Sequence, residues 1–176
     1  MFYFSNREID FATLADIGAI NDLLNHAYRG EASKKGWTTE ADLIAGDTRS
    51  DLAMVEEVMR QPGSVFLIYK DGQQNITGCV NLQQHHDKIY LGMFSVLPVL
   101  QGGGIGKSLL QAAEEYALHI SCHIIYMSVI SVRTELINWY KRHGYVDTGI
   151  RKPFVEDDIT GKHLRPLEFM ILEKQF

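Results

Sequence analysis

The chain has 176 residues and a mass of 20.0 kDa, the size of one globular domain with an ample core, so we expect a single domain over residues 1–176. Hydrophobic residues make up 45% and charged residues 22%, which excludes disordered, collagen-like and low-complexity classes. The net charge of −5 argues against a nucleic-acid-binding protein, because such domains are usually strongly basic.

Two further features predict the compartment. Cys79 and Cys122 are isolated, and no cysteine–histidine cluster has the spacing of metal ligands, so we expect a reducing environment and no metal. The N-terminus carries Glu8 and Asp10 and no long apolar run, which does not fit a signal peptide. No window reaches the ~18 apolar residues of a membrane span, so we expect a cytoplasmic protein that does not bind membranes.

The first third of the chain is predicted to contain one strand and two helices. Residues 2–10 have the composition of a strand. Thr13 and Asp16 have the spacing of a capping box and open a helix that ends near Tyr28. Residues 29–46 show no clear period and predict a loop with a short helical turn. A second helix is expected at 50–60.

Three strands and then a strand–helix–strand–helix unit are predicted to follow. The three strands, joined by short turns and therefore antiparallel, are expected at 64–70, 76–84 and 88–96. The later elements are a helix at 105–118, a strand at 122–130, a helix at 134–143, a strand from Tyr145 and a last strand at 167–173. The unit requires a parallel pair with a crossover. The sequence therefore predicts an α/β (α+β) fold, a mixed, largely antiparallel sheet with helices on both faces.

The most informative segment joins the strand at 88–96 to the helix at 105–118. Its four glycines are Gly102, Gly103, Gly104 and Gly106. Glycines allow a ligand to approach the backbone closely, and the first turn of a helix offers unpaired N–H groups and the positive end of the helix dipole. Phosphate is the ligand that such a junction favours.

Two phosphate-binding patterns fit this segment poorly. Gly106-Lys107-Ser108 matches the end of a Walker A motif, but Gln101 stands where its first glycine belongs. The dinucleotide pattern lacks its third glycine and the acidic residue expected ~20 positions later. The only support for the alternative of a nucleoside-triphosphate enzyme is therefore the match of Gly106-Lys107-Ser108 to the end of the Walker A motif.

A third pattern fits at every defined position. The segment resembles motif A of the GNAT superfamily of acyl-CoA-dependent N-acetyltransferases, V-x-P-x-x-[QR]-x-x-G-x-[GA], which is matched by Val96, Pro98, Gln101, Gly104 and Gly106. The family's second signature, Y-x-x-x-G-[FY], appears at 140–145. The order of elements agrees over most of the chain. The resemblance implies transfer of an acetyl group from acetyl-CoA to an amine of a small molecule or peptide.

The resemblance also implies roles for individual residues. Tyr140 would be the general acid that protonates the departing thiolate. The strand at 88–96 and the next parallel strand would separate to admit the acyl chain, and an N–H near Phe94 or Val96 would polarise the thioester carbonyl. Coenzyme A would be held by the end of that strand and by the glycine loop, namely Phe94, Ser95, Val96, Gln101, Gly102, Gly103, Gly104, Ile105, Gly106, Lys107 and Ser108.

Two departures from the family pattern concern the catalytic machinery. Arg133 stands where the family often has an asparagine that touches the pantetheine arm; it could reach the cofactor or an acidic acceptor, or only cap the sheet. Residues 89–95 contain no carboxylate to act as a base. A water relay near Tyr90 or an acid from elsewhere would be needed. The candidates are Glu31, Glu40 and Asp42, each more often a solvated surface charge.

The resemblance implies that the acceptor lies under residues 28–40, with Tyr28, Glu31 and Trp37 as candidate contacts together with Tyr90. Residues 31–60 hold seven acidic and four basic side chains, which fits either a cationic amine or a solvated helix face. Polyamines, amino acids, aminoglycoside-like compounds and peptide termini remain open. The alternative function is a non-catalytic acyl-CoA sensor. Family members are often dimers, so the resemblance allows a homodimer.

Overall fold

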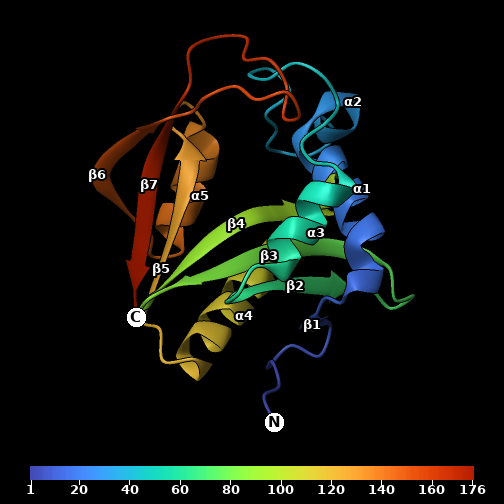
Figure 1. The fold of residues 1–176 in the computed structure, drawn as a ribbon, viewed down its shortest axis with the longest axis vertical. Coiled ribbons are helices and arrows are strands. Elements are labelled where there is room, and N and C mark those ends of the chain that lie inside the picture. The colour runs from blue at the N-terminus through green and yellow to red at the C-terminus, as the bar shows by residue number, and fades with distance from the viewer.

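Seven strands form one mixed sheet in the order β1-β2-β3-β4-β5-β7-β6, as Figure 1 shows for the computed structural model of residues 1–176. Every neighbouring pair is antiparallel except β4 and β5, which are parallel. The predicted mixed, largely antiparallel sheet is therefore confirmed. The strands are β1 (Ile9–Phe11), β2 (Ser64–Lys70), β3 (Ile76–His85), β4 (Lys88–Val96), β5 (Ile124–Ile130), β6 (Val146–Pro153) and β7 (Glu168–Gln175).

Helices cover both faces of the sheet, because successive side chains of a strand point to opposite sides. In β2, Phe66 and Ile68 pack with residues of α1 and α3, whereas Leu67 between them packs against α4. Residues of α5 join the α4 face. The helices are η1 (Leu14–Asp16), α1 (Ile17–Tyr28), α2 (Gly30–Ser33), α3 (Leu52–Arg60), η2 (Pro98–Leu100), α4 (Ile105–His119) and α5 (Thr134–Arg142).

The parallel strands β4 and β5 pair only where they begin. Their register runs from Lys88 opposite Ile124 to Tyr90 opposite Tyr126 and then stops, although both strands continue. A bulge lies in β4 beyond this point, where Met93 has a φ of 48° and the register with β3 shifts. Bulges increase local twist, so β4 turns away from β5. Figure 1 shows the two strands diverging, as the sequence analysis expects.

The predicted first strand is the one large error in the element boundaries. Only Ile9–Phe11 is a strand, whereas residues 2–8 are irregular. The rings of Phe2 and Phe4 pack against Phe11, and Phe2 stacks on His119 of α4. Aromatic packing on a helix therefore holds a segment whose composition resembles a strand. The other predicted elements differ from the structure by no more than two residues at either end.

Two smaller expectations can also be compared with the structure. Cys79 and Cys122 are buried and unpaired, as small core residues. None of the helices combines the length and the apolar composition that crossing a membrane requires.

Candidate functional site

The glycine loop presents free backbone N–H groups at the start of α4. Gly104 is the N-cap with a φ of 94°, and Gly102 has a φ of 85°, a left-handed conformation that favours glycine. The first bond of the helix runs from the N–H of Ser108 to the carbonyl of Gly104, at 3.0 Å. The N–H groups of Ile105, Gly106 and Lys107 precede it and have no partner within the helix. This arrangement is suited to an anion.

A cavity of about 460 Å³ adjoins this loop and extends between β4, α4, α5 and the segment after α1. Most of the residues predicted to hold the cofactor line it: Phe94, Ser95, Val96, Gln101, Gly102, Gly104, Ile105, Gly106, Lys107 and Arg133. Gly103 and Ser108 do not. Among the other predicted site residues, Tyr140, Tyr28 and Trp37 line the cavity, whereas Glu31 and Tyr90 do not. The structure thus gathers side chains from four separate parts of the chain.

Tyr140 lies on α5 and is 4% exposed. Its ring is 6.2 Å from that of Phe94 and 5.7 Å from that of Tyr145, measured between centroids. Burial raises the pKa of Tyr140 well above its ordinary value of 10.0, because an ionised phenolate would lose its hydration. The phenol therefore stays protonated and can donate a hydrogen bond or a proton into the cavity.

Tyr28, the last residue of α1, contacts the free end of β4. Its hydroxyl donates to the carbonyl of Phe94 at 2.9 Å. Burial raises the pKa of Tyr28 to about 12, so this donor also stays protonated at neutral pH. The guanidinium of Arg49 lies over the Tyr28 ring, with its central carbon 5.3 Å from the ring centroid. Tyr28 therefore fixes the strand edge beyond the bulge.

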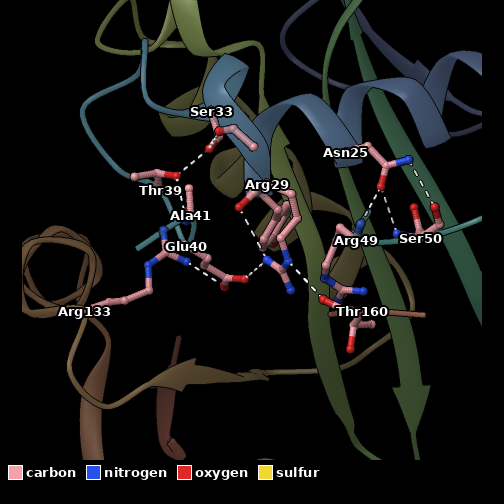
Figure 2. A network of polar contacts seen from close by, with 12 residues as sticks. Asn25, Arg29, Ser33, Thr39, Glu40, Ala41, Arg49, Ser50, Arg133 and Thr160 are labelled. Atoms are coloured by element: carbon pink, nitrogen blue, oxygen red, sulfur yellow. Dashed lines mark hydrogen bonds and ion pairs between the residues drawn. The ribbon is translucent and has the colours of Figure 1, made fainter. Parts of the chain in front are cut away.

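A buried ion-pair network lies behind the cavity wall at Arg133, and Figure 2 shows its contacts. The Glu40 carboxylate accepts from Arg29 Nη1 and, at 2.9 Å, from Arg133 Nη1. Arg29 Nε donates to the Thr160 carbonyl at 3.1 Å, and Arg133 Nη2 donates to Thr38 Oγ1 at 2.7 Å. The network joins the segment after α1, the start of α5 and the connection from β6 to β7. We call these three residues, Arg29, Glu40 and Arg133, the buried charge network.

The expectation that Glu40 is a solvated surface charge is wrong. Glu40 is 6% exposed, because the two guanidinium groups that flank it compensate the loss of hydration. The other candidate bases do lie at the surface. Glu31 and Asp42 both flank Lys34, at 3.0 and 4.0 Å, and neither lines the cavity. Tyr90 packs on Tyr126, with ring centroids 5.3 Å apart, where β4 and β5 still pair.

Several cavity residues are missing from the sequence prediction. Leu136, Trp139 and His143 line the cavity together with Tyr140, and they follow the helical spacing that also marks a core face. The side chain of Gln101 also does more than the motif indicates. It accepts from the Trp37 N–H at 3.1 Å and donates to the Val96 carbonyl at 3.2 Å. Gln101 thus ties the segment after α1 to the end of β4.

The comparison with protein families matches this architecture. The model of the Acetyltransferase (GNAT) family covers residues 19–145, which include the glycine loop, the diverging strands and Tyr140. The chain belongs to the GNAT acetyltransferase family. No curated protein matches the sequence.

Solved structures share the GNAT fold with this chain. A ribosomal-protein-alanine N-acetyltransferase from Brucella melitensis is 21% identical, with a TM-score of 0.70 over 96% of this chain and 99% of that one. The Salmonella typhimurium protein yncA, solved with acetyl-CoA, is 23% identical, with a TM-score of 0.67 over 97% and 94%. A spermidine N-acetyltransferase chimera of Vibrio cholerae SpeG and hSSAT is 16% identical, with a TM-score of 0.68 over 95% and 93%. At these identities the likeness concerns the fold alone.

Proposed function

We propose that this GNAT protein transfers an acetyl group from acetyl-CoA to a primary amine of a small molecule or a peptide, with Tyr140 as the general acid. The observation that carries the proposal is one cavity that joins the glycine loop, the end of β4 that has left β5, and the Tyr140 phenol. These supply an anion site, unpaired backbone groups and a proton donor, which are the requirements of acyl transfer from a coenzyme A thioester.

Two different parts of the cavity would hold the pyrophosphate and the pantetheine arm of coenzyme A. The free N–H groups of Ile105, Gly106 and Lys107, with the ammonium group of Lys107, would bind the pyrophosphate. Arg142 lines the same cavity and adds positive charge. The end of β4, from Phe94 to Val96, would hold the pantetheine arm as an added strand. A backbone N–H in this stretch would polarise the thioester carbonyl.

The proposed reaction forms an N–C amide bond and breaks the thioester C–S bond. The amine nitrogen loses a proton to water, because no carboxylate lines the cavity, and the thiolate gains a proton from Tyr140. The Tyr140 phenolate then takes up a proton from water, so that overall one proton passes from the amine to the thiol. The burial that raises the pKa of Tyr140 also disfavours a charged thiolate in the same cavity. Burial therefore raises the pKa of the proton donor, Tyr140, and that of the proton acceptor, the thiol, in the same direction, so the two stay close to each other.

The absence of a lining carboxylate favours a second candidate, an acyl-CoA-binding sensor that transfers nothing. Both candidates predict cofactor binding, and only the first predicts release of a thiol. The names of the similar structures do not choose an acceptor, since one refers to a protein alanine and another to spermidine.

Thermal unfolding with acetyl-CoA, coenzyme A or Mg-ATP in parallel tests the cofactor. A ligand at a hundred times its Kd stabilises by about 2.7 kcal/mol, which raises the Tm by a few degrees. We expect a shift with both coenzyme A species and none with Mg-ATP. Thiol release in the presence of a panel of amines then separates enzyme from sensor. A protein that neither coenzyme A species stabilises would contradict both.

A further inference from the structure

Arg133 brings a positive charge to the wall of the cavity. It is the N-cap of α5, is 7% exposed, and lines the cavity. Nη1 and Nη2 each donate one hydrogen bond, to Glu40 and to Thr38, but the buried Nε has no hydrogen-bond partner. A guanidinium carries five N–H groups. The buried Nε is closed off from the cavity, so the second N–H groups of Nη1 and Nη2 are the donors left for a guest at the cavity wall.

The charges around Arg133 do not cancel. Two guanidinium groups share the single buried carboxylate of Glu40, and Arg29 Nη2 is also buried without a partner. Glu135 is the other nearby acid, 3.9 Å from Arg133 Nε and beyond hydrogen-bond distance, and its side chain is 45% exposed, so water screens its charge. A buried surplus of positive charge favours an anionic guest.

No acidic residue lines the cavity to attract a cationic guest. The many acids of residues 31–60 do not reach it: Glu40 is paired with arginines, and Glu31 and Asp42 are paired with Lys34 on the surface. The charge count along this segment therefore says little about the acceptor. The side chains that actually line the cavity carry only positive charge or none.

The placement of Arg133 relative to Tyr140 fits a compact acceptor. The two residues are seven positions apart on α5, which is nearly two turns or about 10 Å along the helix, so they share one face. Both line the cavity. A molecule that has its amine at the thioester and an acidic group a few atoms away could reach Arg133.

We propose that the acceptor is an amino-acid-like molecule with a carboxylate near its primary amine, and that Arg133 binds this carboxylate. The inference rests on the proposed acetyl transfer and adds the class of acceptor to it. Arginine suits the role because its planar fork forms paired, charge-assisted hydrogen bonds with a carboxylate. Glu40 and Thr38 each accept one N–H of a terminal nitrogen and so hold the guanidinium in place, which leaves the second N–H of Nη1 and of Nη2 for the carboxylate.

Matched pairs of amines test the proposal in the wild-type protein. Thiol release from acetyl-CoA is measured with leucine and leucinamide, with phenylalanine and phenylalaninamide, and with spermidine as a cationic comparison. We expect kcat/KM to be higher for the carboxylate by about tenfold or more in at least one pair, as a charge-assisted hydrogen bond gives. The amines of the amides are weaker bases than those of the acids, so a larger fraction of each amide is the reactive free amine at a given pH. A preference for the acids is therefore the opposite of what free-amine concentration alone would give.

Variants then ask whether Arg133 causes the preference. In Arg133→Gln the ratio of acid to amide should fall towards one, mainly through KM for the acid, whereas Arg133→Lys should keep part of it. Lys141→Gln is the matched control, since it removes an exposed positive charge of the same helix that does not line the cavity, and its ratio should not fall. The Kd of acetyl-CoA is measured for each variant.

Each other outcome has a distinct meaning. Turnover of amides or spermidine equal to or faster than that of the acids would overturn this inference and leave acetyl transfer standing. A raised Kd for acetyl-CoA in Arg133→Gln, with an unchanged acid-to-amide ratio, would assign Arg133 to the cofactor and also overturn it. Thiol release with none of the amines would overturn the proposed function and this inference together.

Discussion

The glycine loop and the buried charge network both contribute to one cavity, the network through Arg133, but they are built in different ways. The loop is local: a strand end, a few glycines and the first turn of α4 follow one another along the chain. The network is assembled from afar, because Glu40 and Arg133 are 93 positions apart and Arg29 and Thr160 are 131 apart. One site therefore combines a continuous sequence motif, the glycine loop, with a set of residues that only the tertiary fold brings together.

This difference determines how each region should respond to change. The glycine loop presents backbone groups to solvent and contributes little to the core, so its substitutions should affect ligand affinity before stability. The charge network is buried, and its parts compensate one another. Removing one partner leaves an unpaired charge without water, so its substitutions should affect stability first.

The largest effect is expected from breaking the charge network. Glu40→Gln removes the only carboxylate between two buried guanidinium groups, and we expect it to lower the free energy of unfolding by about 3–5 kcal/mol. Urea denaturation followed by circular dichroism measures this. Glu31→Gln is the control in the same segment, since its ion pair with Lys34 is exposed and should change stability by less than about 0.5 kcal/mol. Equal effects would show that burial is not the cause.

Tyr140→Phe probes the centre of the cavity, between the two regions. General acid catalysis contributes ~10²–10⁴ in rate, so loss of the phenol should lower kcat by about tenfold or more while the Kd of acetyl-CoA is retained. Tyr145→Phe is the control, since its hydroxyl is buried without a partner, its ring packs on Tyr140, and it does not line the cavity. That variant should keep its turnover. An unchanged kcat in Tyr140→Phe would remove Tyr140 from the mechanism.

A pair of glycines tests the loop with backbone strain held constant. Gly104 and Gly46 both have a left-handed φ, 94° and 90°, and a Cβ added at either would meet no protein atom within 4 Å. Alanine should therefore destabilise both by a similar amount, of order 1–2 kcal/mol. Only Gly104→Ala puts its methyl group where the phosphate would approach, so only that variant should raise the Kd of acetyl-CoA, by about tenfold. A matching rise in Gly46→Ala would exclude a direct contact.

The same contrast explains which parts of the structure the sequence could predict. Gly104 and Tyr140 belong to spaced motifs, and the alternation around Leu67 marks a strand, so the fold and the glycine side of the site follow from local patterns. Nothing near Glu40 in the sequence indicates burial, because the groups that compensate its charge come from remote segments. The strand predicted at the N-terminus failed for a related reason, since Phe2 packs on a remote helix.

Gln101 connects the two regions, and a smaller effect is expected there. Gln101→Ala removes the hydrogen bonds to Trp37 and Val96, which should cost about 1 kcal/mol each at most because Gln101 is partly exposed. We expect the segment after α1 to loosen, with KM for the amine raised a few-fold and the Kd of acetyl-CoA almost unchanged. Hydrogen exchange at the Trp37 amide measures the loosening directly. A variant that loses cofactor affinity instead would place the role of this side chain at the loop.

The pH profile should lack a falling limb in the ordinary range of tyrosine. A general acid must be protonated, and burial raises the pKa of Tyr140 well above 10.0 and that of Tyr28 to about 12, so neither phenol ionises at working pH. From about pH 6.5 to about pH 9.5, kcat/KM should rise without a decline as the acceptor amine loses its proton. Thiol release, corrected for thioester hydrolysis without enzyme, gives the profile. A decline within this range that Tyr140→Phe abolishes would mean that the phenol is far more acidic than its burial allows, and that water reaches it in the working enzyme.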